Sequence, residues 1–447
     1  MNKTQLWSAS LFVSLLSTLP ACDALLNGEG EGEGEGEGEG EGEGEGEGEG
    51  EGEGEGEGEG EGEGEGEGVA WTRMVLTNDV DGVNHGEDQV TAIHFDSLAV
   101  GFIGTDGKSG VGALYRASNQ AITAKALPDE VFVNGPTAFG DFGARTFTKT
   151  RTGYLLGLNE CESAIISTDN GATFTRQRTG LQYGLASMMS FLQGGDGTFT
   201  AIVDSGVIAQ SSVAPATGVQ WEELWAPEGS PPTPDPVPAG ACSDGPVGRS
   251  TEGLVQVTYV SPDRQLMAYL PRDGLVDEHL VCVSDNGGTL FEPRSLPSVN
   301  DGDNPIGATA VFFTSNTVGF VATSDNTFGP GGSATIRTTT DGGDTWTATV
   351  LPARFASSAN VINFIFFAPG NQVGWAIGSV EGGDVRPLVL KTVDGGATWR
   401  EALALNLLAG EIEGVAARLT TGFAVDADHI WVGGLNGSLF ASTTGGD

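Results

Sequence analysis

Four aspartates recur in nearly identical surroundings and are the first residues whose spacing suggests chemistry. They lie in the segments STDNGATF (167–174), VSDNGGTL (283–290), TTDGGDTW (339–346) and TVDGGATW (392–399), at Asp169, Asp285, Asp341 and Asp394. Two carboxylates about 6.5–9.5 Å apart across a cleft can cleave a glycosidic bond with inversion. Aspartate also accepts backbone hydrogen bonds in tight turns, where Gly and Asn adopt positive φ. We interpret these aspartates as structural turns and predict no catalytic residue among them.

The other residue types that support catalysis form no recognisable pattern. The histidines, His85, His94, His279 and His429, are scattered, and neither H-E-x-x-H nor C-x-x-C occurs. The sequence therefore predicts no zinc site. Two oxygen-rich stretches, 78–88 and 300–304, are candidates for calcium but lack the EF-hand spacing, and solvated acidic turns are the alternative. We expect no cofactor, with calcium as the one weak candidate.

The N-terminal residues have the features of an export signal. Lys3 supplies positive charge, and residues 11–19 form an apolar run too short to span a bilayer permanently. The following LPAC (19–22) resembles the bacterial lipobox, which implies cleavage after residue 21 and acylation of Cys22. Ordinary signal cleavage nearby is the alternative. The resemblance implies an extracytoplasmic lipoprotein anchored to a membrane, facing the periplasm or the cell surface.

Three further cysteines remain, and an odd number in an oxidising compartment allows at most one intrachain disulfide. Cys161 falls in a predicted loop and Cys242 in a proline-rich insertion, whereas Cys282 lies inside an apolar strand. We predict a Cys161–Cys242 disulfide and a buried Cys282 thiol.

Charge and composition define the linker that follows. The chain carries a net charge of -41 on 61 acidic and 20 basic residues, and residues 28–68 strictly alternate Gly and Glu. Such a segment cannot form a core, because Gly maximises chain entropy and the glutamates repel one another. We predict a disordered acidic linker over 22–68, between a signal peptide (1–21) and a folded domain (69–447). It is either a stalk or a tolerated spacer, and the negative charge disfavours nucleic acid as a partner.

From residue 69 onward the pattern is that of an all-β protein with internal repeats. Short apolar runs alternate with Gly, Asn, Asp and Pro, and phrases of the form V-G-aromatic-apolar recur, as in VGFVATSD (318–325) and VGWAIGSV (373–380). The aspartate segments, which we call boxes, repeat at intervals of about 50 residues, long enough for four strands. Counting degenerate boxes near 119 and 215, this spacing predicts a β-propeller of about seven four-stranded blades.

Each box is predicted to join the last two strands of a blade, with its Trp buried against its own sheet. The last box, STTGGD (442–447), stops before its Trp, and VAWTRMVL (69–76) begins with one. Laid after Asp447, Trp71 takes the missing Trp position. We therefore predict that the N-terminal strand supplies the outer strand of the last blade and closes the ring.

The boxes and the V-G-aromatic phrases resemble the Asp-box, or BNR-repeat, propellers, which include bacterial sialidases, sortilin-type receptors and photosystem II assembly-factor-like proteins. The resemblance covers residues 69–447 and is specific for fold, but the Arg-Ile-Pro signature and nucleophile pair of a sialidase are absent. We expect a non-enzymatic binding or assembly module for a protein or glycan of the cell envelope, in monomeric form. A glycan-processing hydrolase on the same scaffold is the alternative. The insertion 226–246 is expected to be a surface loop, for recognition or passive.

Overall fold

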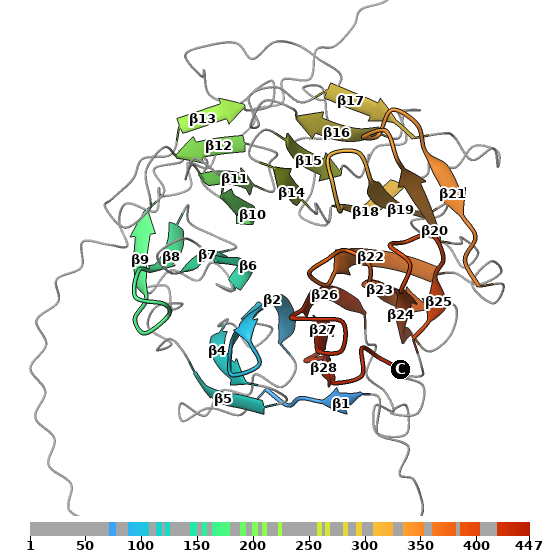
Figure 1. Cartoon of the computed structure of the whole chain (residues 1–447). Coiled ribbons are helices and arrows are strands. Elements are labelled where there is room, and N and C mark those ends of the chain that lie inside the picture. Colours follow the sequence, from blue (N-terminus) through green and yellow to red (C-terminus); the bar gives the residue numbers. More distant parts are fainter. Residues whose placement is uncertain are drawn as a thin grey trace, which may run out of the picture. The chain divides into compact units, whose positions relative to one another are not determined.

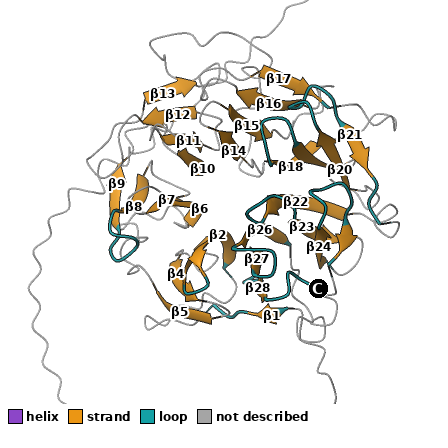
Figure 2. Cartoon of the chain, viewed as in Figure 1, coloured by secondary structure: helices purple, strands orange, loops and turns teal. Residues whose placement is uncertain are grey.

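The computed structural model shows strands joined by turns and loops (Figures 1 and 2). All residues that the structure describes belong to the unit Val69–Asp447. The structure describes residues 71–76, 88–106, 113–118, 121–125, 144–149, 154–158, 163–178, 188–193, 199–203, 208–211, 222–225, 257–261, 264–268, 280–284, 292–296, 307–324, 334–352, 360–380, 385–402 and 418–447. None of these residues is helical, and so none belongs to a helix able to cross a membrane. The predicted all-β class is confirmed.

The described strands form seven four-stranded antiparallel sheets, which we number I to VII. The first four are I with β2 (Gln89–Ser97), β3 (Val100–Asp106), β4 (Ala113–Ser118) and β5 (Ala121–Lys125); II with β6 (Ala144–Lys149), β7 (Tyr154–Leu158), β8 (Ser163–Ser167) and β9 (Thr175–Arg178); III with β10 (Met188–Gln193), β11 (Phe199–Val203), β12 (Ile208–Ser211) and β13 (Glu222–Trp225); and IV with β14 (Val257–Ser261), β15 (Arg264–Ala268), β16 (Leu280–Ser284) and β17 (Glu292–Ser295). The others are V with β18 (Gly307–Phe313), β19 (Gly319–Ser324), β20 (Ala334–Thr339) and β21 (Thr347–Thr349); VI with β22 (Asn360–Phe367), β23 (Gly374–Val380), β24 (Arg386–Thr392) and β25 (Arg400–Glu401); and VII with β26 (Leu419–Ala424), β27 (Ile430–Gly434), β28 (Leu439–Ser442) and β1 (Thr72–Arg73).

Six of the sheets are formed from four consecutive strands, and sheet VII combines the two ends of the described chain. In it β1 pairs antiparallel with β28, with Thr72 opposite Ala441 and Arg73 opposite Phe440. Met74 continues this edge, because its backbone N–H donates to the Leu439 carbonyl over 2.8 Å. The N-terminal strand therefore occupies the fourth position of sheet VII.

The sheets lie side by side with their first strands toward the middle of Figure 1 and their fourth strands at the periphery. Contacts join the first strands of successive sheets: β26 with β2, β2 with β6, β6 with β10, β14 with β18, β18 with β22, and β22 with β26. A sheet with neighbours on both faces must be apolar on both faces, and the burial pattern of β23 shows this, with six successive residues buried.

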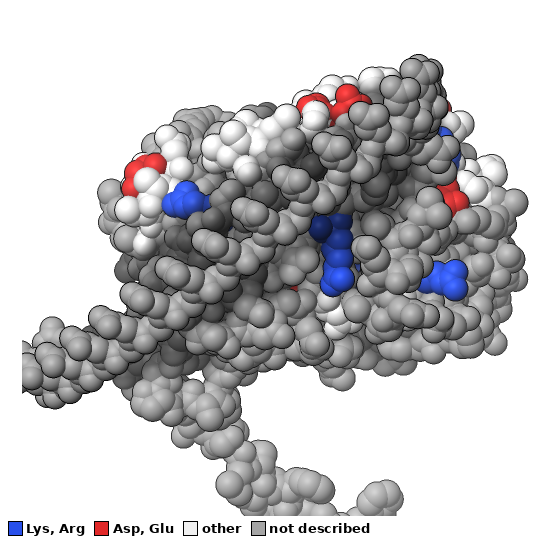
Figure 3. Space-filling model, turned by 90° about the horizontal axis from the view of Figure 1, so that it is seen from below, with Lys and Arg blue, Asp and Glu red and all other residues white. Residues whose placement is uncertain are grey.

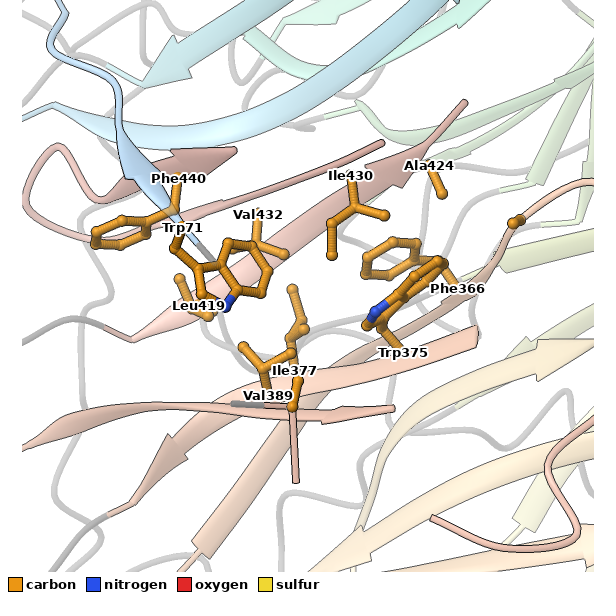
Figure 4. Close-up of a cluster of buried hydrophobic side chains, with 12 residues drawn as sticks. Trp71, Phe366, Trp375, Ile377, Val389, Leu419, Ala424, Ile430, Val432 and Phe440 are labelled. Carbon is orange, nitrogen blue, oxygen red and sulfur yellow. The ribbon is translucent and has the colours of Figure 1, made fainter. Parts of the chain in front are cut away.

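Large side chains fill the space between neighbouring sheets. Between sheets VI and VII, Trp71 and Phe440 pack with Phe366 and Trp375 in one cluster of buried residues (Figure 4). Trp71 and Trp375 are only 1% and 0% exposed. The sequence predicted that a box Trp packs on its own sheet, but the structure places the ring between two sheets. Trp399 of sheet VI, for instance, lies 6.1 Å from Phe367 of its own sheet and 6.1 Å from Phe320 of sheet V, edge-on to both.

The glycine of the V-G-aromatic phrase has a structural cause that the pattern alone did not reveal. In sheet VI, Gly374 is the cross-strand partner of Phe367, whose ring folds over it. A Cβ on Gly374 would lie 2.5 Å from that ring. Sheet I repeats the arrangement with Phe95 over Gly101. A large ring on the first strand thus requires a glycine on the second, as in aromatic rescue of strand glycines.

Candidate functional site

The box carboxylates are held inside their own turns, between the third and fourth strands of a sheet. In sheet V, Asp341 Oδ1 accepts hydrogen bonds from the Thr339 hydroxyl (2.7 Å) and the Thr345 backbone N–H (2.9 Å). Its Oδ2 accepts the Thr345 hydroxyl at 2.5 Å. Thr339 Oγ1 in turn accepts the Gly343 N–H at 2.8 Å. Every polar atom of the carboxylate therefore has a donor from the same eight-residue segment.

The same bonds recur at Asp169, with Ser167 and Thr173, and at Asp394, with Thr392 and Thr398. The two residues after each aspartate have positive φ: 56° and 79° for 170 and 171, 82° and 98° for 342 and 343, and 69° and 90° for 395 and 396. This left-handed backbone explains why the boxes carry D-N-G or D-G-G.

These hydrogen bonds keep the carboxylates ionised. Donation by the Thr173 hydroxyl and N–H lowers the pKa of Asp169 to about 2, and Thr345 has the same effect on Asp341, to about 2. Thr398 lowers the pKa of Asp394 as well. A general acid must hold a proton near the working pH, so these three groups are unsuited to that role at neutral pH.

At two described junctions, a basic residue on the third strand of one sheet reaches the box of the next sheet. Arg116 of β4 lies 5.5 Å from the centroid of the Phe102 ring and donates to the Gly171 carbonyl in the sheet II box. In sheet VI, Lys391 lies 5.9 Å from the Trp375 ring and donates to Asp447 Oδ2 over 2.8 Å. Both stand directly across from the aromatic residue of the V-G-aromatic phrase.

The box of sheet VII has Thr444 in place of the aspartate, and a different carboxylate lies beside it. Ser442 Oγ accepts the Gly446 N–H at 2.8 Å, as in the other boxes. Asp447 receives Lys391 and Arg400 from sheet VI. Partial burial by itself would raise the pKa of Asp447, but hydrogen bonds from the two basic side chains lower it overall. Asp447 is therefore ionised and forms ion pairs that join sheet VII to sheet VI.

The first strands of three neighbouring sheets bring together a set of rings, which we call the inner aromatic cluster: His94 (β2), Phe147 (β6) and Phe423 (β26). The His94 ring lies 5.6 Å from that of Phe147 and 5.0 Å from that of Phe423, and all three side chains are partly exposed. His94 Nε2 is 3.0 Å from Asp96 Oδ1. Aromatic faces beside a polar pair can bind a sugar ring or a peptide side chain.

The sequence-derived site residues divide by whether the structure describes them. Asp169, Asp341, Asp394 and Trp71 are described, as is the backbone of Cys282 in β16. The positions that lie outside the described residues are Cys22, Cys161, Cys242, Asp285, the linker, the 226–246 insertion and the oxygen-rich stretches apart from Asp88. Within the described part, no group of three or more His, Cys, Asp or Glu side chains is placed to hold a metal ion. Sequence reasoning missed the inner aromatic cluster, whose members are about 50 to 330 residues apart and share only a place on a first strand.

Comparison with known proteins gives a likeness of fold. No protein-family model matches the sequence, and no curated protein matches it. Among solved structures, YCF48 bound to D1 peptide is similar with a TM-score of 0.53 at 14% identity, over 84% of this chain and 97% of that one. YCF48 from Cyanidioschyzon merolae has a TM-score of 0.51 at 14% identity, over 84% and 98%.

The GH74 xyloglucanase from Xanthomonas campestris is similar with a TM-score of 0.54 at 16% identity, over 84% of this chain and 53% of that one. The chain thus corresponds to about half of the xyloglucanase. At these identities the similarity extends to the fold and not to activity. Because these neighbours are β-propellers, the chain has a β-propeller fold.

Proposed function

We propose that this protein is a cell-envelope lipoprotein whose β-propeller is a non-enzymatic binding or assembly module. The observation that carries the proposal is the state of the box carboxylates at Asp169, Asp341 and Asp394, which are ionised and occupied by donors of their own turns. The most conspicuous acids of the sequence are therefore committed to structure.

The proposed architecture is a closed ring of seven blades. It is supported by the seven described sheets, by the contacts between their first strands, and by β1 at the edge of sheet VII. In this arrangement Trp71 closes the ring, and the first strands line its central channel. A rigid ring offers a preformed surface at low entropic cost, which suits a binding module.

The inner aromatic cluster is the proposed ligand contact, for a protein or glycan of the envelope. On the face in Figure 3, the described basic side chains lie apart from one another without forming a continuous basic patch. Together with the net charge of -41, this favours a neutral or basic ligand over a nucleic acid.

Ligand capture tests the binding function. The full chain is immobilised and exposed to a solubilised envelope extract, with His94→Ala and Phe423→Ala as variants. As a control we choose Val393→Ala, a change at an exposed valine of the sheet VI box. The wild type and the control should retain the same partner, and both cluster variants should lose it. Equal retention by all four proteins contradicts the cluster as the contact.

A screen for hydrolysis tests the alternative. The full chain should leave sialosides and β-glucans, xyloglucan included, uncleaved. Turnover that one Asp or Glu substitution abolishes would replace the binding module with a glycan hydrolase.

Anchoring rests on Cys22, whose LPAC context resembles a lipobox. Mass spectrometry of the mature protein should find Cys22 as an acylated N-terminus, and Cys22→Ser should move the protein to the soluble envelope fraction. An unmodified N-terminus at another residue would refute the lipid anchor and leave the propeller's function untouched.

A further inference from the structure

Arg337 in β20 is a buried cation without a counter-ion in the described structure. The residue is only 5% exposed, between Val321 of β19 and Ala348 of β21. Its Nε is buried without an acceptor, and no hydrogen bond or ion pair links the guanidinium to any residue that the structure describes. Burial lowers the pKa of Arg337, the direction expected when a cation loses water.

The register shows that this position belongs to the apolar packing between sheets. Arg337 stands two residues before the first Ser or Thr of its box, on the third strand. The residues at this position in sheets II, VI and VII are Ile165, Leu390 and Phe440, all 0% or 1% exposed. Leu390 packs with residues of the preceding sheet V, and Phe440 with residues of the preceding sheet VI.

By the same register Arg337 faces sheet IV. Its cross-strand partner Val321 belongs to the cluster that contains Val281 and Val283 of sheet IV. The other described arginine at this junction, Arg294 of β17, is already engaged by Glu292 and by Asp344 at 3.0 Å. A leucine at 337 would suit this apolar setting, and a largely buried guanidinium without a counter-ion among the described residues is costly. Packing therefore does not account for an arginine at this position.

A planar guanidinium recognises oxyanions, because its N–H groups can pair with two oxygens of a carboxylate or phosphate. A polyanion would be repelled by a chain of net charge -41, whereas a small anion meets mainly the local field of Arg337. We propose that Arg337 forms a binding site between sheets IV and V for one small oxyanion, a carboxylate or a phosphate. The site is independent of the inner aromatic cluster and of the proposed binding function.

Thermal unfolding of the full chain in sodium acetate, sodium phosphate and sodium chloride, at equal ionic strength, tests the site. The variants are Arg337→Leu and Arg337→Lys, and Arg386→Leu is the matched control at an exposed position of β24. Wild type and Arg386→Leu should gain a few degrees in one oxyanion relative to chloride. Arg337→Leu should gain nothing, and in chloride it should unfold at a temperature equal to or above that of wild type.

Arg337→Lys should keep a reduced response with an apparent affinity about tenfold weaker, because a point charge replaces the bidentate fork. A response to acetate identifies a carboxylate ligand, and a response to phosphate alone identifies a phosphate. The site is refuted if neither oxyanion stabilises wild type, or if Arg337→Leu responds as wild type does. An Arg337→Leu protein less stable in chloride, or unable to fold, would also refute it, since the arginine would then be a structural group.

Discussion

At the scale of single residues, the boxes show how one aspartate side chain stabilises a turn by accepting several hydrogen bonds. The carboxylate of Asp341 accepts three hydrogen bonds, and two successive residues with positive φ follow it. Its ionised form is the better acceptor, because hydrogen bonds to a charged group are stronger than those between neutral groups. The stability of the turn should therefore depend on pH.

The pH dependence has a definite sign. The pKa of Asp341 falls from its ordinary value of 3.8 to about 2 in the folded chain. The contribution of Asp341 to the stability of the folded chain is thus present above about pH 4 and is lost as the pH falls toward 2. Asp341→Asn should lower the unfolding temperature at pH 7 and flatten its decline between pH 4 and pH 2. Val393→Ala, at the exposed valine of the sheet VI box, serves as the control with the wild-type slope, because it changes no titratable group. A wild-type slope in Asp341→Asn would contradict the assignment.

The basic residues across from the V-G aromatics act between neighbouring sheets. Lys391 is 4% exposed and lies between the Trp375 ring and Asp447, in the position that Arg116 holds in sheet I. Lys391→Met should cost about 1–2 kcal/mol in the free energy of unfolding, since Asp447 keeps Arg400 as a partner. Lys391→Arg should cost less than Lys391→Met, because arginine serves at the same position in sheet I. Denaturant unfolding measures both, and equal losses would show that charge at this position is irrelevant.

At the scale of strands and sheets, an aromatic ring on the first strand of a sheet packs over a glycine on the second strand. The ring of Phe367 occupies the space where a Gly374 side chain would lie, 2.5 Å from its Cβ. Repetition of this pairing in sheets I, V and VI makes it a rule of the repeat. The pairing couples the ring position on the first strand to the glycine position on the second strand, which a sequence motif treats as separate.

Gly374→Ala should destabilise the protein by about 1–3 kcal/mol, the usual cost of overpacking a filled site. The cost should shrink when Phe367→Leu is introduced as well, because the shorter side chain leaves room for the methyl group. A double-mutant cycle by denaturant unfolding measures this coupling. Additive effects would show that the ring is not what excludes the methyl group.

At the scale of the whole molecule, the two ends of the described chain meet in sheet VII. Thr72 stands opposite Ala441, and Arg400 opposite Lys391 at the corresponding place in sheet VI. The N-terminal strand therefore takes the register of an ordinary fourth strand. Without it, Trp71 would leave the cluster between sheets VI and VII.

Chains beginning at Gly68 and at Thr77 should differ in stability, although both lack the Gly-Glu tract. The shorter chain should unfold at a clearly lower temperature, and Trp71→Ala alone should cost about 3–5 kcal/mol, as for other buried aromatic residues. Thermal and denaturant unfolding provide the measurements. Equal unfolding temperatures of the two chains would be incompatible with ring closure by residues 69–76.

The sequence by itself determined what is local or periodic. Alternation of apolar residues gave the all-β class, and the box spacing of about 50 residues indicated four strands per repeat. The D-G-G segments predicted positive φ, because glycine adopts that backbone without strain. Placing Trp71 after Asp447 was possible because both ends carry fragments of one motif.

Tertiary structure alone decided what depends on neighbouring sheets. A box Trp packs between two sheets, and Lys391 donates a hydrogen bond to Asp447 of the next sheet. The rings of His94, Phe147 and Phe423 come together from three sheets. Arg337 has no counter-ion among the described residues, and comparison of its register with that of Leu390 shows that it occupies an apolar position. A repeat defines its own strands by local pattern, but contacts between repeats join residues at separations that no pattern specifies, so they emerge only when the sheets are packed together.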